Sequence, residues 1–142
     1  MSANMVTASL IKEINENHED LVILNFANGD MVGHTGDYES AIVAVETVDA
    51  CIEKILENIS LEEYTLIVTA DHGNAEVMKN KDGSINTSHT TNKVPFIVTD
   101  KKLKLKDGKL SDIAPTILYL MGEQIPKEMT GNILIKNRKV VK

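Results

Sequence analysis

The chain has 142 residues, enough for one domain with a hydrophobic core, and its 42% hydrophobic content is ordinary for a globular protein. Its formal net charge of -6 argues against nucleic acid as the main partner, because lysine and arginine must neutralise phosphates in such complexes. No apolar run approaches the roughly 20 residues that span a bilayer, and residues 1–10 lack a signal-peptide pattern, so we expect a cytoplasmic protein without a membrane partner.

The N-terminal half of the chain predicts alternating helices and strands. Residues 6–15 carry apolar side chains at helical spacing, and residues 21–24 predict a short buried strand. The strongest helix signal covers residues 38–56, where apolar residues recur every three or four positions and Asp37 offers an N-cap. Residues 64–69 predict a second strand. A strand, a helix and a strand in this order are typical of a parallel crossover unit, and hence of an α/β fold.

The C-terminal half begins with a long polar stretch over residues 71–92. A loop of this length in a compact domain is usually functional or disordered. Residues 94–98 predict a third strand, followed by a small hairpin with its turn at residues 107–108. We expect Ser111 to cap a further helix that stops at Gly122.

Three of the four histidines lie beside predicted strand ends, together with two aspartates. Asp30 and His34 follow the first strand at a D-x-x-x-H spacing, which places both side chains on one face if the loop makes a helical turn. Asp71 and His72 follow the second strand, and His89 precedes the third. Ligands bind at strand ends in open α/β sheets. Aspartate and histidine together suit divalent ions such as Mn²⁺ or Zn²⁺.

The spacing divides these five residues into two sets. Asp30, His34 and His89 would give one ion three protein ligands and open positions, which is typical of a catalytic metal. Asp71 and His72 could hold a second ion, although two ligands are too few by themselves. A single histidine near a strand end is more often a hydrogen-bonded loop residue, and Asp71 alone could be a turn residue. Three such clusters at equivalent positions favour a metal site over coincidence.

The motifs around these residues resemble a known family. The resemblance is carried by the segments NFANGDMVGHTG, TADHGNAEVM, SHTTNKVPF and LSDIAPTILYLMGEQIPKEMTGNILI. They are similar to the C-terminal part of the cofactor-independent phosphoglycerate mutases of the alkaline phosphatase superfamily. This resemblance implies an α/β fold that is part of a doubly wound, mostly parallel sheet with helices on both faces. One departure is Gly29, where family members commonly have proline before the metal-binding aspartate.

The resemblance also implies a function. Family members use two Mn²⁺ ions and a serine nucleophile to interconvert 3-phosphoglycerate and 2-phosphoglycerate through a phosphoserine enzyme, as the two-metal template for phosphoryl transfer suggests. Carried over by motif, Asp30, His34 and His89 resemble the ligands of one ion. Asp71 and His72 resemble ligands of the other ion, in a site that is incomplete here.

The family's serine nucleophile and another metal-binding aspartate lie near the start of a much longer chain, and the serines here match no nucleophile motif. We therefore expect residues 1–142 to form a single domain, the C-terminal segment of the metal-binding phosphatase-like domain. We expect this fragment to bind one Mn²⁺ ion or none and not to turn over phosphoglycerate. We also expect self-association, because an incomplete sheet leaves an open edge and an uncovered apolar face.

Two alternatives stay open. Another enzyme of the superfamily, such as a phosphopentomutase or a phosphodiesterase, would share the D-x-x-x-H, D-H-G and H-T elements. A non-catalytic metal-binding or partner-binding module would keep the ligands without the chemistry, and only the missing nucleophile supports it. The extended similarity of NFAN, ADHGN and HTTN favours the mutase over the other enzymes.

Overall fold

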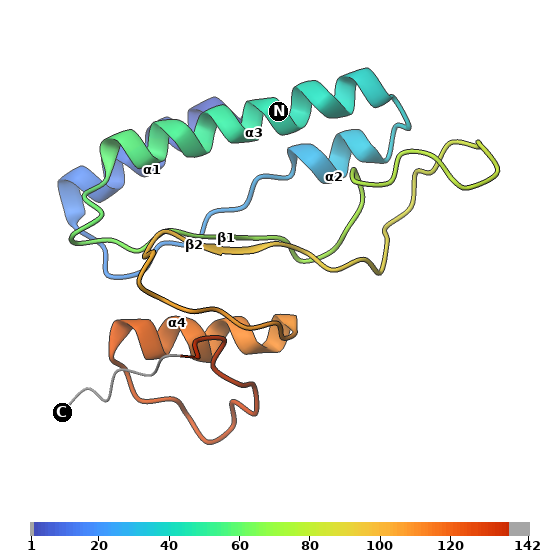
Figure 1. Ribbon diagram of the computed structural model, residues 1–142. Coiled ribbons are helices and arrows are strands. Elements are labelled where there is room, and N and C mark those ends of the chain that lie inside the picture. Colours follow the sequence, from blue (N-terminus) through green and yellow to red (C-terminus); the bar gives the residue numbers. More distant parts are fainter. Residues whose placement is uncertain (1, 137–142) are drawn as a thin grey trace. The chain divides into compact units, whose positions relative to one another are not determined.

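Three helices, two short strands and a C-terminal helical segment follow one another in the computed structural model, which describes residues 2–136. The elements are, in chain order, α1 (Ala3–Asn17), α2 (Asn28–Gly33), α3 (Tyr38–Asn58), β1 (Ile67–Thr69), β2 (Phe96–Val98), the 3-10 helix η1 (Leu110–Asp112) and α4 (Ile113–Met121) (Figure 1). The chain divides into two compact units, Met1–Ile97 and Val98–Lys142. The predicted α/β class is confirmed, and the single domain over residues 1–142 stays a prediction.

The long helix α3 is the scaffold of the first unit. It begins after Asp37, whose carboxylate accepts a hydrogen bond from the backbone N–H of Ser40 at 3.2 Å, so the predicted N-cap is confirmed. Both α1 and α2 pack on α3 (Figure 1). The buried stripe of α3 begins with Ala41 and Ala44, whose small side chains allow another helix to approach closely. This packing fixes the position of the short helix α2.

The sheet of the first unit is smaller than the sequence predicts. β1 pairs with β2, and residues 2–136 contain no other named strand. The strand predicted at residues 21–24 is wrong, because no strand among residues 2–136 pairs with this segment to bond its backbone groups. Its Leu21 and Ile23 side chains are 48% and 82% exposed rather than buried. The doubly wound, mostly parallel sheet with helices on both faces therefore stays a prediction.

The second unit is organised around the buried carboxylate of Asp112. This group accepts hydrogen bonds from the backbone N–H of Asn132 at 2.7 Å and of Lys109 at 3.0 Å. These two bonds, that of Asn132 above all, hold the pKa of Asp112 below its ordinary value. The expectation that Ser111 caps the helix is wrong, because Ser111 lies inside η1 and Asp112 precedes α4 instead. The predicted stop is confirmed, since Gly122 ends α4 with a φ of 76°.

The hairpin predicted at residues 107–108 does not form. Leu105 forms an isolated antiparallel bridge with Ile135, near the end of the described chain. The neighbouring backbone N–H of Lys106 donates to the carbonyl of Leu134 at 3.0 Å. Because Leu134 and Ile135 are buried, this pairing covers an apolar run that a hairpin within the lysine-rich segment would have left uncovered. Among the described residues, no helix is long and apolar enough to cross a membrane.

Asp112→Asn should lower the unfolding midpoint at neutral pH, because the neutral amide is a weaker acceptor for the two backbone N–H groups. The pKa of Asp112 is lower in the folded state than its ordinary value of 3.8. Its stabilisation is therefore complete above that value and is lost as the pH falls through the folded pKa. Thermal unfolding over a pH series should show the gap between parent and variant closing in acid. Asp100→Asn is the matched control, since Asp100 is exposed and accepts one backbone bond; an equal loss in both variants would contradict the role of Asp112.

We expect the protein to self-associate through the apolar side chains that the first unit leaves exposed. Ile97 on β2 is 56% exposed, in addition to Leu21 and Ile23. The two-stranded sheet also leaves strand edges without a partner strand among the described residues. Light scattering should show a mass that rises with concentration, and Ile23→Lys should reduce the rise. A monomeric mass at every concentration would contradict this expectation.

Candidate metal centre

Helix α2 brings Asp30 and His34 to one face. The two residues lie one turn apart, and Asp30 Oδ1 is 3.2 Å from His34 Nε2. The helical turn expected from the D-x-x-x-H spacing is therefore present. Gly29 lies in the first turn of α2, where an added Cβ would meet nothing within 4 Å. The first turn of α2 thus forms with glycine at position 29, where members of the family that the sequence resembles commonly have proline.

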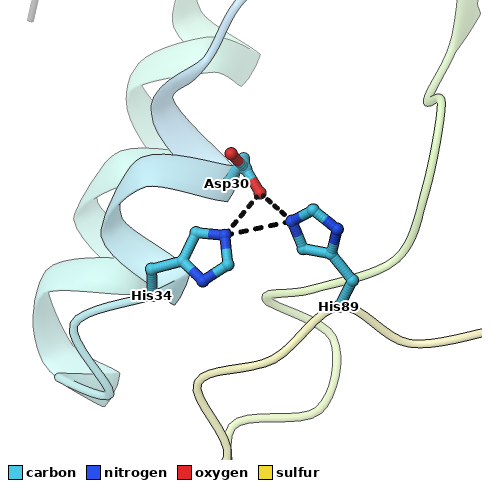
Figure 2. Close-up of side chains that lie close together, drawn as sticks. All are labelled: Asp30, His34 and His89. Carbon is cyan, nitrogen blue, oxygen red and sulfur yellow. Dashed lines mark hydrogen bonds and ion pairs between the residues drawn. The ribbon is translucent and has the colours of Figure 1, made fainter.

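His89 reaches the same point from the loop that precedes β2. Its Nε2 atom lies 2.9 Å from Asp30 Oδ1 and 3.0 Å from His34 Nε2 (Figure 2). Ligand atoms about 2.1 Å from one divalent ion lie about 3 Å from one another, so this spacing fits a shared ion. Asp30, His34 and His89, here called the triad, therefore form a candidate metal-binding group.

The other ring nitrogen of His34 is already engaged. His34 Nδ1 lies 2.6 Å from the backbone carbonyl of Thr87. A carbonyl oxygen can only accept, so Nδ1 carries a proton. In the neutral form of the ring, the lone pair then lies on Nε2, which faces Asp30 and His89. Histidines that bind metals typically donate their second N–H to a carbonyl or carboxylate in this way. His34 is thus held in the tautomer and orientation of a ligand.

Asn74 lies against the triad, and the sequence did not single it out. Its side chain is buried, and Nδ2 lies 3.3 Å from Asp30 Oδ1 and 3.4 Å from His34 Nε2. Gly33 permits this approach, because a Cβ there would overlap the Asn74 amide. The only sequence signal was the place of Asn74 in the A-D-H-G-N motif, where an asparagine after glycine suits an ordinary turn equally well.

The two residues expected at a second ion are placed differently from each other. His72 lies against the triad: its ring stacks on His89 with centroids 3.7 Å apart, and its Nε2 is 3.7 Å from Asp30 Oδ1. Asp71 Oδ1 is also 3.7 Å from His72 Nε2, but the Asp71 side chain is 79% exposed. A second ion at Asp71 and His72 therefore stays a prediction.

The sequence is similar to those of known metalloenzymes. The model of the family described as "Metalloenzyme superfamily" matches residues 1–124. Among curated relatives, the 2,3-bisphosphoglycerate-independent phosphoglycerate mutases of Flavobacterium johnsoniae, Flavobacterium psychrophilum and Bacteroides thetaiotaomicron are 57%, 54% and 49% identical to it. These matches cover 95%, 95% and 96% of this chain and 27% of each relative. The chain thus spans about a quarter of the length of these relatives.

The tautomer of His34 can be tested by NMR. Because Thr87 accepts from Nδ1, we expect the neutral ring of the metal-free protein to be protonated at Nδ1 and bare at Nε2. Long-range ¹H–¹⁵N correlation spectra at a pH of about 8, where an ordinary histidine is neutral, report this directly. His18 is exposed and lies outside the triad, so it serves as the internal reference. A proton on Nε2 of His34 would contradict the arrangement.

Proposed function

Because the chain belongs to the metalloenzyme superfamily, we propose that the triad binds a divalent metal ion. The observation that carries this proposal is the mutual approach of one carboxylate oxygen and two imidazole nitrogens, each within 3.2 Å of the other two. The hydrogen bond between His34 Nδ1 and the Thr87 carbonyl supports this proposal, because it leaves Nε2 of His34 as the nitrogen that can bind an ion. The choice of Mn²⁺ over Zn²⁺ rests on the family resemblance.

We further propose that the chain acts as part of a phosphoglycerate mutase, an isomerase of glycolysis. Such an enzyme would interconvert 3-phosphoglycerate and 2-phosphoglycerate through a phosphoserine, with two Mn²⁺ ions. The support is the name shared by relatives that are 49–57% identical over nearly the whole of this chain. This similarity favours the mutase over a phosphopentomutase or a phosphodiesterase. A cytoplasmic location goes with this proposal.

The charge and exposure of the triad suit an anionic phosphate ester. A divalent ion there, when bound, would stabilise negative charge on a transferring phosphoryl group. Two neutral imidazoles and one carboxylate would leave such an ion with net positive charge. The side chains of Asp30, His34 and His89 are 34%, 43% and 49% exposed, so a small anion can reach them from solvent.

We propose that residues 1–142 by themselves bind one Mn²⁺ ion and do not interconvert phosphoglycerates. Phosphoryl transfer through an enzyme serine requires an activated hydroxyl beside the metal. Over residues 2–136, no serine hydroxyl hydrogen-bonds to the triad. Asp71 and His72 are only two of the ligands that a second ion needs, so this second site is expected to stay empty.

The first experiment is a Mn²⁺ titration of metal-stripped protein, followed by EPR. We expect one ion per chain in the parent and a loss of affinity of about 100-fold or more in His34→Ala, since a ligand should matter at least as much as the outer residues that typically contribute 10–100-fold. His18→Asn is the matched control: it also removes a histidine, one that is exposed and outside the triad. Its affinity should equal that of the parent.

Each outcome decides one part of the proposal. No binding by the parent, or equal binding by His34→Ala, would overturn the metal site. An equal loss of affinity in the His18→Asn control would show that the effect of removing a histidine is not specific to the triad, which also contradicts the proposal. The Mn²⁺-loaded parent should then be assayed with 3-phosphoglycerate, and appreciable formation of 2-phosphoglycerate in a rigorously purified sample would contradict the inactivity of these residues alone.

A further inference from the structure

We propose that Glu76 is a positioning residue, which fixes His89 at the triad by joining the two ends of the loop between β1 and β2. This inference rests on the proposed metal binding. It adds a residue whose hydrogen bonds, in the described part of the chain, go to neighbours of the triad and not to the triad itself, so its effect on the metal would pass through those neighbours.

The Glu76 carboxylate accepts three hydrogen bonds from both ends of the loop. Oε2 accepts from the backbone N–H of Asn74 at 2.6 Å. Oε1 accepts from the hydroxyl of Thr90 and from the side-chain amide of Asn92, the latter at 3.1 Å. The hydrogen bond from Thr90 is the main reason why the pKa of Glu76 lies below its ordinary value. The charged carboxylate is therefore the form that holds these partners.

Both groups held by Glu76 are next to parts of the site. Thr90 directly follows His89, so a fixed Thr90 limits where the His89 ring can lie. Asn74, held through its backbone, points its side-chain amide at Asp30 Oδ1. One carboxylate thus positions a triad residue on one side and the amide neighbour of Asp30 on the other.

The backbones of the two loop ends approach each other closely where Glu76 binds them. The N–H of Thr90 donates to the carbonyl of Gly73 at 2.8 Å, within an isolated antiparallel bridge between these two residues. A Cβ at position 73 would overlap both the Thr90 hydroxyl and the Glu76 carboxylate, so only glycine lets the three groups meet. Loss of the Glu76 carboxylate would leave the Gly73–Thr90 bridge and the hydrogen bond between His34 Nδ1 and the Thr87 carbonyl to position His89.

The far part of the loop is held independently. Asp82 accepts hydrogen bonds from the backbone N–H and the hydroxyl of Ser84, at 3.0 Å and 2.6 Å. Lys79 and Ile85 form a second isolated bridge across this turn. Asp82 therefore offers a matched control, because it is a carboxylate of the same loop that orders the turn and not the segments beside the triad.

The test measures Mn²⁺ affinity by EPR in Glu76→Ala, Glu76→Gln, Thr90→Val and Asp82→Asn. We expect a loss of about 10–100-fold in Glu76→Ala, as is typical for residues that orient metal ligands. Glu76→Gln should recover part of it, since the amide oxygen can still accept from Asn74 and the Thr90 hydroxyl can accept as well as donate. Thr90→Val should weaken binding less than Glu76→Ala, and Asp82→Asn should bind like the parent.

A second readout follows the His89 ring directly in metal-free protein. We expect Glu76→Ala to shift or broaden the ring ¹H–¹⁵N signals of His89, and Asp82→Asn to leave them unchanged. A merely structural role would lower the unfolding midpoint of Glu76→Ala without changing the His89 signals or the affinity of the folded protein. That pattern would overturn the inference.

The outcomes separate this inference from the proposed function. If the parent binds Mn²⁺ and Glu76→Ala binds it equally well, the role of Glu76 is wrong and the metal site stands. If the parent binds no Mn²⁺, the proposed function fails, and with it the role of Glu76 toward a metal. Should Glu76→Ala fail to fold, Glu76→Gln and Thr90→Val carry the test, and parent-like affinity and His89 signals in both would overturn the inference.

Discussion

The convergence of polar groups on one oxygen, Asp30 Oδ1, constrains the arrangement of the first unit. The Nε2 atoms of His89, His34 and His72 lie 2.9, 3.2 and 3.7 Å from it, and Asn74 Nδ2 lies 3.3 Å from it. These groups come from α2, from the turn after β1 and from the loop before β2. Because the Thr87 carbonyl accepts a hydrogen bond from Nδ1 of His34, the neutral His34 ring carries its lone pair on Nε2, which faces this oxygen. The Asn74 amide donates to this oxygen, whereas a divalent cation would be coordinated by the oxygen together with the imidazole lone pairs of His34 and His89.

The scaffold holds this point by close approach of small residues. The buried stripe of α3, on which α1 and α2 pack, includes two alanines, and Gly33 lets α2 meet the buried Asn74. Gly73 lets the turn after β1 approach Thr90. There the Glu76 carboxylate accepts hydrogen bonds from both ends of the loop between β1 and β2. The site therefore depends on glycine and alanine positions, which allow close approach, as much as on its polar side chains. The three triad side chains are 34–49% exposed, so solvent reaches the site.

The sequence by itself predicted the features that depend on neighbours along the chain. The periodicity of α3 and its Asp37 cap are local, because apolar spacing and a side-chain oxygen three residues from its donor decide them. The Asp30–His34 pair is local as well, since a helical turn puts positions i and i+4 on one face. The recurrence of aspartate and histidine at strand ends and the family motifs then pointed to His89 as their companion.

Only the tertiary structure decided the features that need a distant partner. Residues 21–24 have the composition of a strand, but a strand forms only where a neighbouring strand bonds its backbone, and none does so in the part of the chain that the structure describes. Leu105 bridges Ile135 rather than folding back locally, because burying a distant apolar run outweighs a turn signal. Asn74 and Glu76 looked like ordinary loop residues, since their roles come from contacts with segments 14 to 44 positions away. Hydrogen bonds across such separations leave no periodic trace in a sequence.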